Sequence, residues 1–127
     1  MGQQQILLLV VAAIVIILAI AIGIDMFAAN AQSSNRESIV SELNNLGTLA
    51  LQYYRKSPPY GGGGLSFKSW LIPVDLDTTS NGMYSLSCTD LSATITALGK
   101  EMGDNGSTPI EMVAEITSAG IDITIVN

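Results

Sequence analysis

Few groups of residues in this sequence have the types and spacing that catalysis or metal binding requires. The sequence contains no histidine, which excludes the commonest general base, histidine-dependent triads and histidine-based metal sites. Asp75 and Asp77 resemble the start of a calcium-binding loop. However, Ser80 stands where such a loop needs glycine, and Leu86 stands where it needs a bidentate glutamate. We therefore expect no enzyme activity, no metal site and no cofactor, and we interpret the two aspartates as an acidic turn.

Three further motifs have both a chemical interpretation and a plainer structural one. The glycine run 61–64 lacks the Gly-Lys-Ser/Thr ending of a phosphate-binding loop and follows an expected helix rather than a strand, so we interpret it as a connection. Cys88 is the only cysteine and is expected to be a small buried side chain. Asn105 fits the Asn-x-Ser pattern with Ser107 and is a candidate glycosylation site; an unmodified surface turn is the alternative.

The charge of the chain argues against a nucleic-acid-binding surface. The sequence carries 5 basic and 11 acidic residues, so its formal net charge is −6 at pH 7. The basic residues do not gather along one element of the sequence; they are Arg36, Arg55, Lys56, Lys68 and Lys100. A surface that neutralises phosphates needs a concentrated patch of Lys and Arg. We therefore expect no nucleic-acid partner.

The first half of the sequence predicts helical structure with two kinds of surface. Residues 6–24 form an uncharged apolar run, ILLLVVAAIVIILAIAIGI. As a helix this run spans about 28 Å, which matches the hydrocarbon core of a bilayer. In residues 25–56 apolar side chains recur mostly at spacings of three and four, with polar residues between them. This period is typical of an amphipathic helix that buries one face.

The two segments are expected to form one continuous helix over residues 1–56. No proline precedes Pro58, and proline is the strongest interruption of a helix. An alternative is a break near Gln32, because Ser34 and Glu37 have the spacing of a capping box that starts a second helix.

Residues 57–127 predict a small β-rich head. Ser57-Pro58-Pro59 ends the helix, and the glycine run follows as a connection. Strands are expected over residues 66–74, 83–88, 93–98, 110–117 and 121–126. Asn81-Gly82 and Asn105-Gly106 are strong turn dipeptides between them. The stretch 89–102 has a short helix as its alternative.

The expected fold class is α+β, with one long N-terminal α-helix packed on a small antiparallel sheet. The apolar face of such a sheet must be covered, and only the amphipathic segment 25–56 offers a stripe of suitable length. The side chains expected beneath the sheet are Leu43, Leu46, Ala50 and Tyr53.

The uncharged start, the apolar run, the amphipathic extension and the β-rich head together resemble a type IV pilin or a pilin-like relative. Mature pilins of that family begin with a Phe or Met that a prepilin peptidase exposes, and Met1 fits such a start. Their fifth residue is a Glu that pairs with the amino terminus of a neighbouring subunit, whereas this chain has Gln5. Gln5 offers only a carbonyl oxygen for this contact, and we expect Gln3 and Gln4 to share the role as hydrogen-bonding amides.

The resemblance implies a major pilin, which polymerises with identical subunits into a helical extracellular filament on the cell surface. It also implies a membrane anchor before assembly, pilus assembly machinery and prepilin peptidase as partners, and roles such as adhesion or motility. Two alternatives remain open. One is a single-span, membrane-anchored β-domain that binds a partner, and the other is a minor pilin or a pseudopilin of a secretion system.

Overall fold

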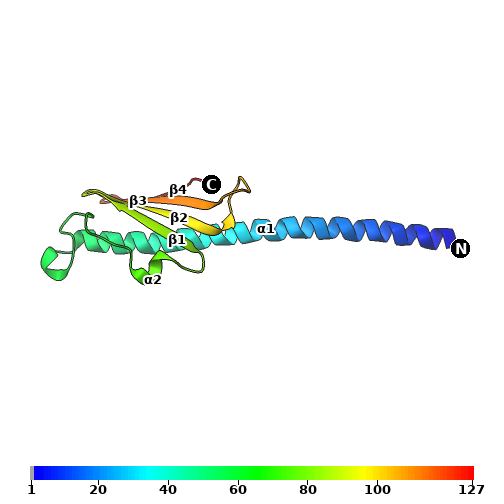
Figure 1. Ribbon diagram of the computed structural model, residues 1–127, viewed down its shortest axis with the longest axis horizontal. Helices are drawn as coiled ribbons and strands as arrows, with labels where there is room; N and C mark the ends of the chain where they lie inside the picture. Colours follow the sequence, from blue (N-terminus) through cyan, green and yellow to red (C-terminus); the bar gives the residue numbers. More distant parts are fainter. Residues whose placement is uncertain (1) are drawn as a thin grey trace. The chain divides into compact units, whose positions relative to one another are not determined.

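The computed structural model describes residues 2–127, and its longest element is the helix α1, which begins at Gly2 and ends at Arg55 (Figure 1). The expected single helix is therefore confirmed. A second helix start does not form, because Ser34 and Glu37 both lie inside α1. A capping box needs a residue with non-helical backbone at its first position, and here the helical hydrogen bonds continue past it.

The helix ends where the sequence turns to proline. Ser57 has an extended backbone, with φ −68° and ψ 146°, and a short 3-10 helix, η1 (Pro58–Tyr60), follows. This is the conformation that the residue before a proline prefers. The chain divides into two compact units, Met1–Ala31 and Gln32–Asn127.

The second unit contains one four-stranded sheet in the order β1-β2-β3-β4, with every neighbouring pair antiparallel (Figure 1). The strands are β1 (Gly82–Cys88), β2 (Ser92–Met102), β3 (Pro109–Thr117) and β4 (Gly120–Ile125). The last four expected strands are confirmed, and with them the α+β class. The alternative helix over residues 89–102 is wrong, because β2 occupies most of that stretch.

The strand expected over residues 66–74 is wrong. The segment forms turns and then the single-turn helix α2 (Val74–Asp77). Phe67 and Trp70 are both buried, and the Trp70 N–H donates to the Phe67 carbonyl. This spacing of three places both aromatic side chains in the core, whereas a strand would send residues 67 and 70 to opposite faces. The segment closes one end of the core instead of extending the sheet.

Residues Gln32–Arg55 of α1 contribute one side of a single hydrophobic core, and the inner face of the sheet contributes the other. The core side chains are Ile39, Leu43, Leu46, Ala50, Phe67, Trp70, Tyr84, Ala93, Ile95, Ala97, Ile110, Met112, Ala114 and Ile116. Helix and sheet approach closely at Gly47, where an added Cβ would lie 2.5 Å from the Ile121 Cδ1 atom. A larger residue at position 47 would therefore force the Ile121 side chain to move, so glycine fits this position because of packing and not because of backbone conformation.

Candidate functional site

Within residues 2–127, the apolar segment of α1 is a contiguous surface that no other part of the chain buries. Its large side chains are exposed over fractions that run from 49% at Val10 to 72% at Leu9. The most apolar window of the helix has a mean hydropathy of 3.4, and none of that window is buried. By length and composition, α1 is able to cross a membrane as an anchor or a signal segment.

The residues expected to act at the N-terminal end lie at the beginning of this segment. Gln3, Gln4 and Gln5 are exposed on the first turns of α1. Met1 lies outside the described residues. The three amides therefore precede the apolar surface directly, with their side chains free for contacts outside the chain.

The residues expected beneath the sheet occupy the core side of α1. Leu43, Leu46 and Ala50 are at most 1% exposed, and Tyr53 is half-buried at the edge of the core. Next to Tyr53, the Tyr54 ring stacks on Phe67 with ring centroids 4.5 Å apart. This stacking joins the last turns of the helix to the connection that follows it.

Glu42 is the centre of a polar cluster that joins α1 to β1. Its carboxylate accepts hydrogen bonds from Thr79 Oγ1 and Asn81 Nδ2, each at 2.9 Å, and from the Tyr84 hydroxyl. Burial, together with the hydrogen bond to Glu42 and its negative charge, raises the pKa of Tyr84 far above its ordinary range. The cluster holds the turn before β1 on the helix and requires a protonated Tyr84.

The raised pKa of Tyr84 predicts a loss of stability in alkali. Below the ordinary tyrosine pKa of about 10, the group is protonated in both states and the cluster is intact. Above that value the unfolded chain loses the proton first, so the free energy of unfolding falls as pH rises, by up to about 1.4 kcal/mol for each pH unit. Urea unfolding between about pH 9 and pH 11.5 measures this slope.

Tyr84→Phe is the matched control for that measurement, because it keeps the ring in the core and removes the titrating hydroxyl. The substitution leaves every other residue of the chain unchanged. The difference between the two slopes therefore belongs to Tyr84. Equal slopes would show that its hydroxyl is not held in the protonated form by the fold.

Asn35 is a second polar anchor on α1 and is itself buried. Its Nδ2 donates to the Asn81 carbonyl at 2.8 Å, and its Oδ1 accepts the backbone N–H groups of Lys100 at 3.0 Å and Glu101 at 3.2 Å. The pairing of β2 with β3 shifts register between Leu98 and Met102. In a regular strand these two N–H groups would bond to a neighbouring strand. At this irregularity of β2, the Asn35 side chain accepts them instead.

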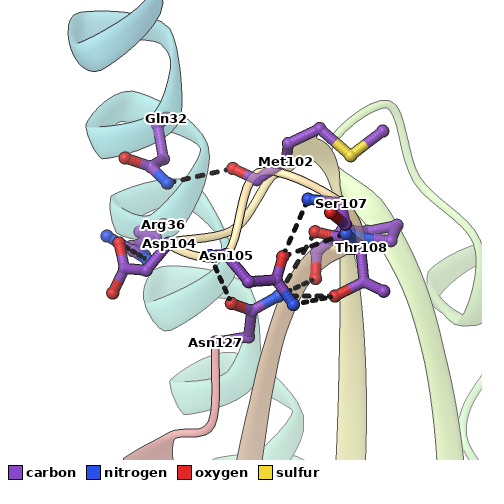
Figure 2. Close-up of polar contacts among 9 residues, drawn as sticks. Gln32, Arg36, Met102, Asp104, Asn105, Ser107, Thr108 and Asn127 are labelled. Carbon is purple, nitrogen blue, oxygen red and sulfur yellow. Dashed lines mark hydrogen bonds and ion pairs between the residues drawn. The ribbon is translucent and has the colours of Figure 1, made fainter.

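The loop between β2 and β3, residues 103–108, is tied to two other parts of the head (Figure 2). On the helix side, Arg36 forms an ion pair with Asp104 at 2.8 Å, and Gln32 Nε2 donates to the Met102 carbonyl at 3.0 Å. On the other side, Asn127 Nδ2 donates to the Thr108 hydroxyl at 2.8 Å and the Asn127 Oδ1 accepts from the backbone of Asn105 at 3.2 Å.

Asn105 lies at the exposed tip of this loop, as its turn signal predicts. Its Oδ1 accepts the backbone N–H groups of Ser107 and Thr108, and its Nδ2 donates to the Thr108 hydroxyl at 2.8 Å. These bonds build the turn around the Asn105 side chain. The structure thus gives Asn105 a role in the turn whether or not the residue is modified.

The remaining motifs occupy structural positions. Asp75 and Asp77 are exposed on α2, and no group of three metal-ligating side chains occurs within residues 2–127. Cys88 is half-buried rather than buried; burial raises the pKa of its thiol, and its Sγ lies 3.8 Å from the Trp70 carbonyl. The glycine run packs on the end of α1, where the Gly63 N–H donates to the Tyr53 carbonyl at 2.8 Å.

The sequence predicted the apolar segment and the buried face of α1 but not the polar anchors Glu42 and Asn35.

No known protein family, characterised protein or solved structure matches this chain. The long helix with an apolar N-terminal segment, together with a small antiparallel sheet on its C-terminal half, is compatible with a pilin-like fold.

Proposed function

We propose that this chain is the structural subunit of an extracellular, type IV pilus-like filament and polymerises through residues 6–24. The observation that carries the proposal is that no part of this apolar segment's most apolar window is buried, on a helix whose other half belongs to a folded core. An apolar surface of this size is not stable in water and needs a partner. In the proposal that partner is the membrane before assembly and the same segment of neighbouring subunits afterwards.

The exchange of lipid for protein contacts gains little from the hydrophobic effect, because lipid tails are as apolar as leucine. Close packing between helices, repeated along the polymer, therefore has to supply the stability. The small residues Ala12, Ala13, Ala19, Ala21 and Gly23 allow neighbouring helices to approach each other. In this arrangement Gln3, Gln4 and Gln5 pair their amides with neighbouring subunits in the core of the filament.

A membrane-anchored β-domain that does not polymerise is the second candidate, since α1 also meets the requirements of a membrane span. Electron microscopy of the native material distinguishes the two. Long uniform filaments that contain this chain as their main component are expected for a major pilin. Protein that is found only in membranes, with no filament at any expression level, would exclude polymerisation and leave the anchor.

Within the filament, α1 is expected to remain helical through residues 10–22. In a core without water, each unpaired backbone group costs several kcal/mol, so the helix opens only where the sequence already weakens it. No proline precedes Pro58 and no glycine lies between Gly2 and Gly23. Gly23, beside Asp25, is the weakest point, since glycine is about 1 kcal/mol poorer than alanine in a helix.

A filament map at side-chain resolution checks this expectation directly. Continuous helical density from Val10 to Ile22 is the expected result. Extended backbone anywhere in that range would show that packing between subunits outweighs the local preference of the helix.

A further inference from the structure

Three of the five basic residues lie at one end of the head, although the basic residues do not cluster along one element of the sequence. Arg55 ends α1 and Lys56 follows it, and the connection folds back on them so that the Gly64 N–H donates to the Lys56 carbonyl at 3.0 Å. The Phe67 N–H donates to the Asp90 carbonyl at 3.2 Å, which brings Lys68 to the same end. We call this end the cationic tip.

The cationic tip also carries exposed apolar side chains. They are Tyr60, Leu65, Leu71 and Leu91, with exposed fractions of 75%, 65%, 78% and 74%. Within residues 2–127 the ion pair of Arg36 with Asp104 is the only one, so the cations of the tip form no ion pair in their own chain. Asp90 lies at the same end, where its carboxylate accepts a hydrogen bond from the Ser66 hydroxyl at 3.4 Å. Exposed apolar groups beside unpaired cations are typical of a surface that contacts an acidic partner.

The outer face of the sheet, which points away from α1, has the complementary character. Glu115 of β3 and Asp122 of β4 are direct cross-strand partners, and both are exposed. Like charges in this arrangement repel each other and destabilise the sheet unless a cation neutralises them. Glu111 lies on the same face, in one cross-strand row with the exposed side chains of Met83 and Leu98.

We propose that the cationic tip of one subunit docks on the outer sheet face of a second copy of this chain. The contact joins unlike surfaces, and such a heterologous contact that does not close on itself produces a helical polymer. It deepens the proposed filament function and rests on it. A second copy is favoured over an anionic membrane or a nucleic acid because the chain itself provides the complementary acidic surface, the exposed pair Glu115 and Asp122 on the outer face of the sheet.

Charge reversal on each surface tests the contact in cells that assemble the full chain. The tip variant is Lys56→Glu with Lys68→Glu, and the face variant is Glu115→Lys with Asp122→Lys. Each is expected to lower the yield of sedimentable filaments at least about tenfold, because it replaces attraction by repulsion. All four substitutions together restore opposite charges and are expected to return the yield to within about twofold of the unaltered protein.

The matched control is Asp75→Lys with Asp77→Lys, which changes the net charge as much as the face variant but on α2, a helix that contains neither the tip cations nor the acidic pair of the sheet. Its filament yield is expected to stay unchanged. The face variant keeps a like-charged pair at positions 115 and 122, so its head is expected to melt at nearly the temperature of the unaltered head. Thermal melting of both variants separates loss of docking from loss of folding.

The possible outcomes are distinguishable. Unaffected filaments in the tip or face variant would overturn the docking contact and leave the filament function standing. The docking contact would also be overturned if the combined variant did not recover its filament yield. It would likewise be overturned if only the tip variant lost filament yield and this variant also bound anionic vesicles less well. Absence of filaments from the unaltered protein would overturn the filament function itself.

Discussion

Deletion of residues 1–25 is expected to leave a soluble, monomeric head that no longer polymerises or sediments with membranes. The deletion removes nearly all of the contiguous apolar surface of the chain. Among residues 2–127, it removes no core side chain, because every buried residue of this range lies in the unit Gln32–Asn127. Sedimentation of the truncated protein, with circular dichroism to confirm its folding, measures this result. A stable fibre formed by the truncated protein would show that another surface drives assembly.

A pair of substitutions in the full chain separates the apolar character of the segment from its length. Ile14→Ala keeps the segment uncharged, and its polymerisation is expected to persist. Ile14→Asp places a carboxylate in the middle of the apolar run, which costs about 2.5–3.5 kcal/mol in a membrane. We expect it to prevent membrane insertion and assembly together. Filaments of normal yield from Ile14→Asp would contradict a dry, closely packed core.

The main elements of the fold were predictable because they depend on local sequence. The absence of proline before Pro58 and the helical spacing of Ile39, Leu43 and Leu46 predict α1 and its buried side. The alternation in residues 121–125 predicts β4, and the turn dipeptide at Asn105 predicts the turn before β3. In each case the signal lies within a few residues of the element that it specifies.

The failures concern features that only long-range packing decides. Residues 66–74 contain enough apolar side chains for a strand, but Phe67 and Trp70 fill the end of the core and the segment pairs with neither edge strand of the sheet. The sequence alone does not show which end of the core needs side chains from another segment to fill it. Tertiary packing therefore overrode the local preference of this segment.

The polar anchors of the head were not predictable for the same reason. Glu42 and Tyr84 are separated by 42 residues in the sequence, and Asn35 and Lys100 by 65. On α1, both Glu42 and Asn35 look like ordinary polar residues of an amphipathic helix. A weak signal existed at Asn35, since an amide on the stripe that includes Ile39 and Leu43 would be buried and would need partners.

Leu46→Ala is expected to lower the free energy of unfolding of the head by about 2–5 kcal/mol. Leu46 is 1% exposed and lies in the core between α1 and the sheet. Its truncation removes buried methyl groups and leaves a cavity, because a close-packed core relaxes only partly around the deleted atoms. Thermal and urea unfolding of the truncated head measure the change.

Leu91→Ala is the matched control, because it deletes the same atoms from a side chain that is 74% exposed. Its effect is expected to stay within about 0.5 kcal/mol. Leu46→Asp should prevent folding altogether, since it buries a carboxylate in a cluster of apolar core side chains. If Leu46→Ala and Leu91→Ala shifted the midpoint equally, α1 would not be packed against the sheet in solution. A loss of stability in Leu46→Ala but not in Leu91→Ala is therefore the result expected if packing between α1 and the sheet holds the head together.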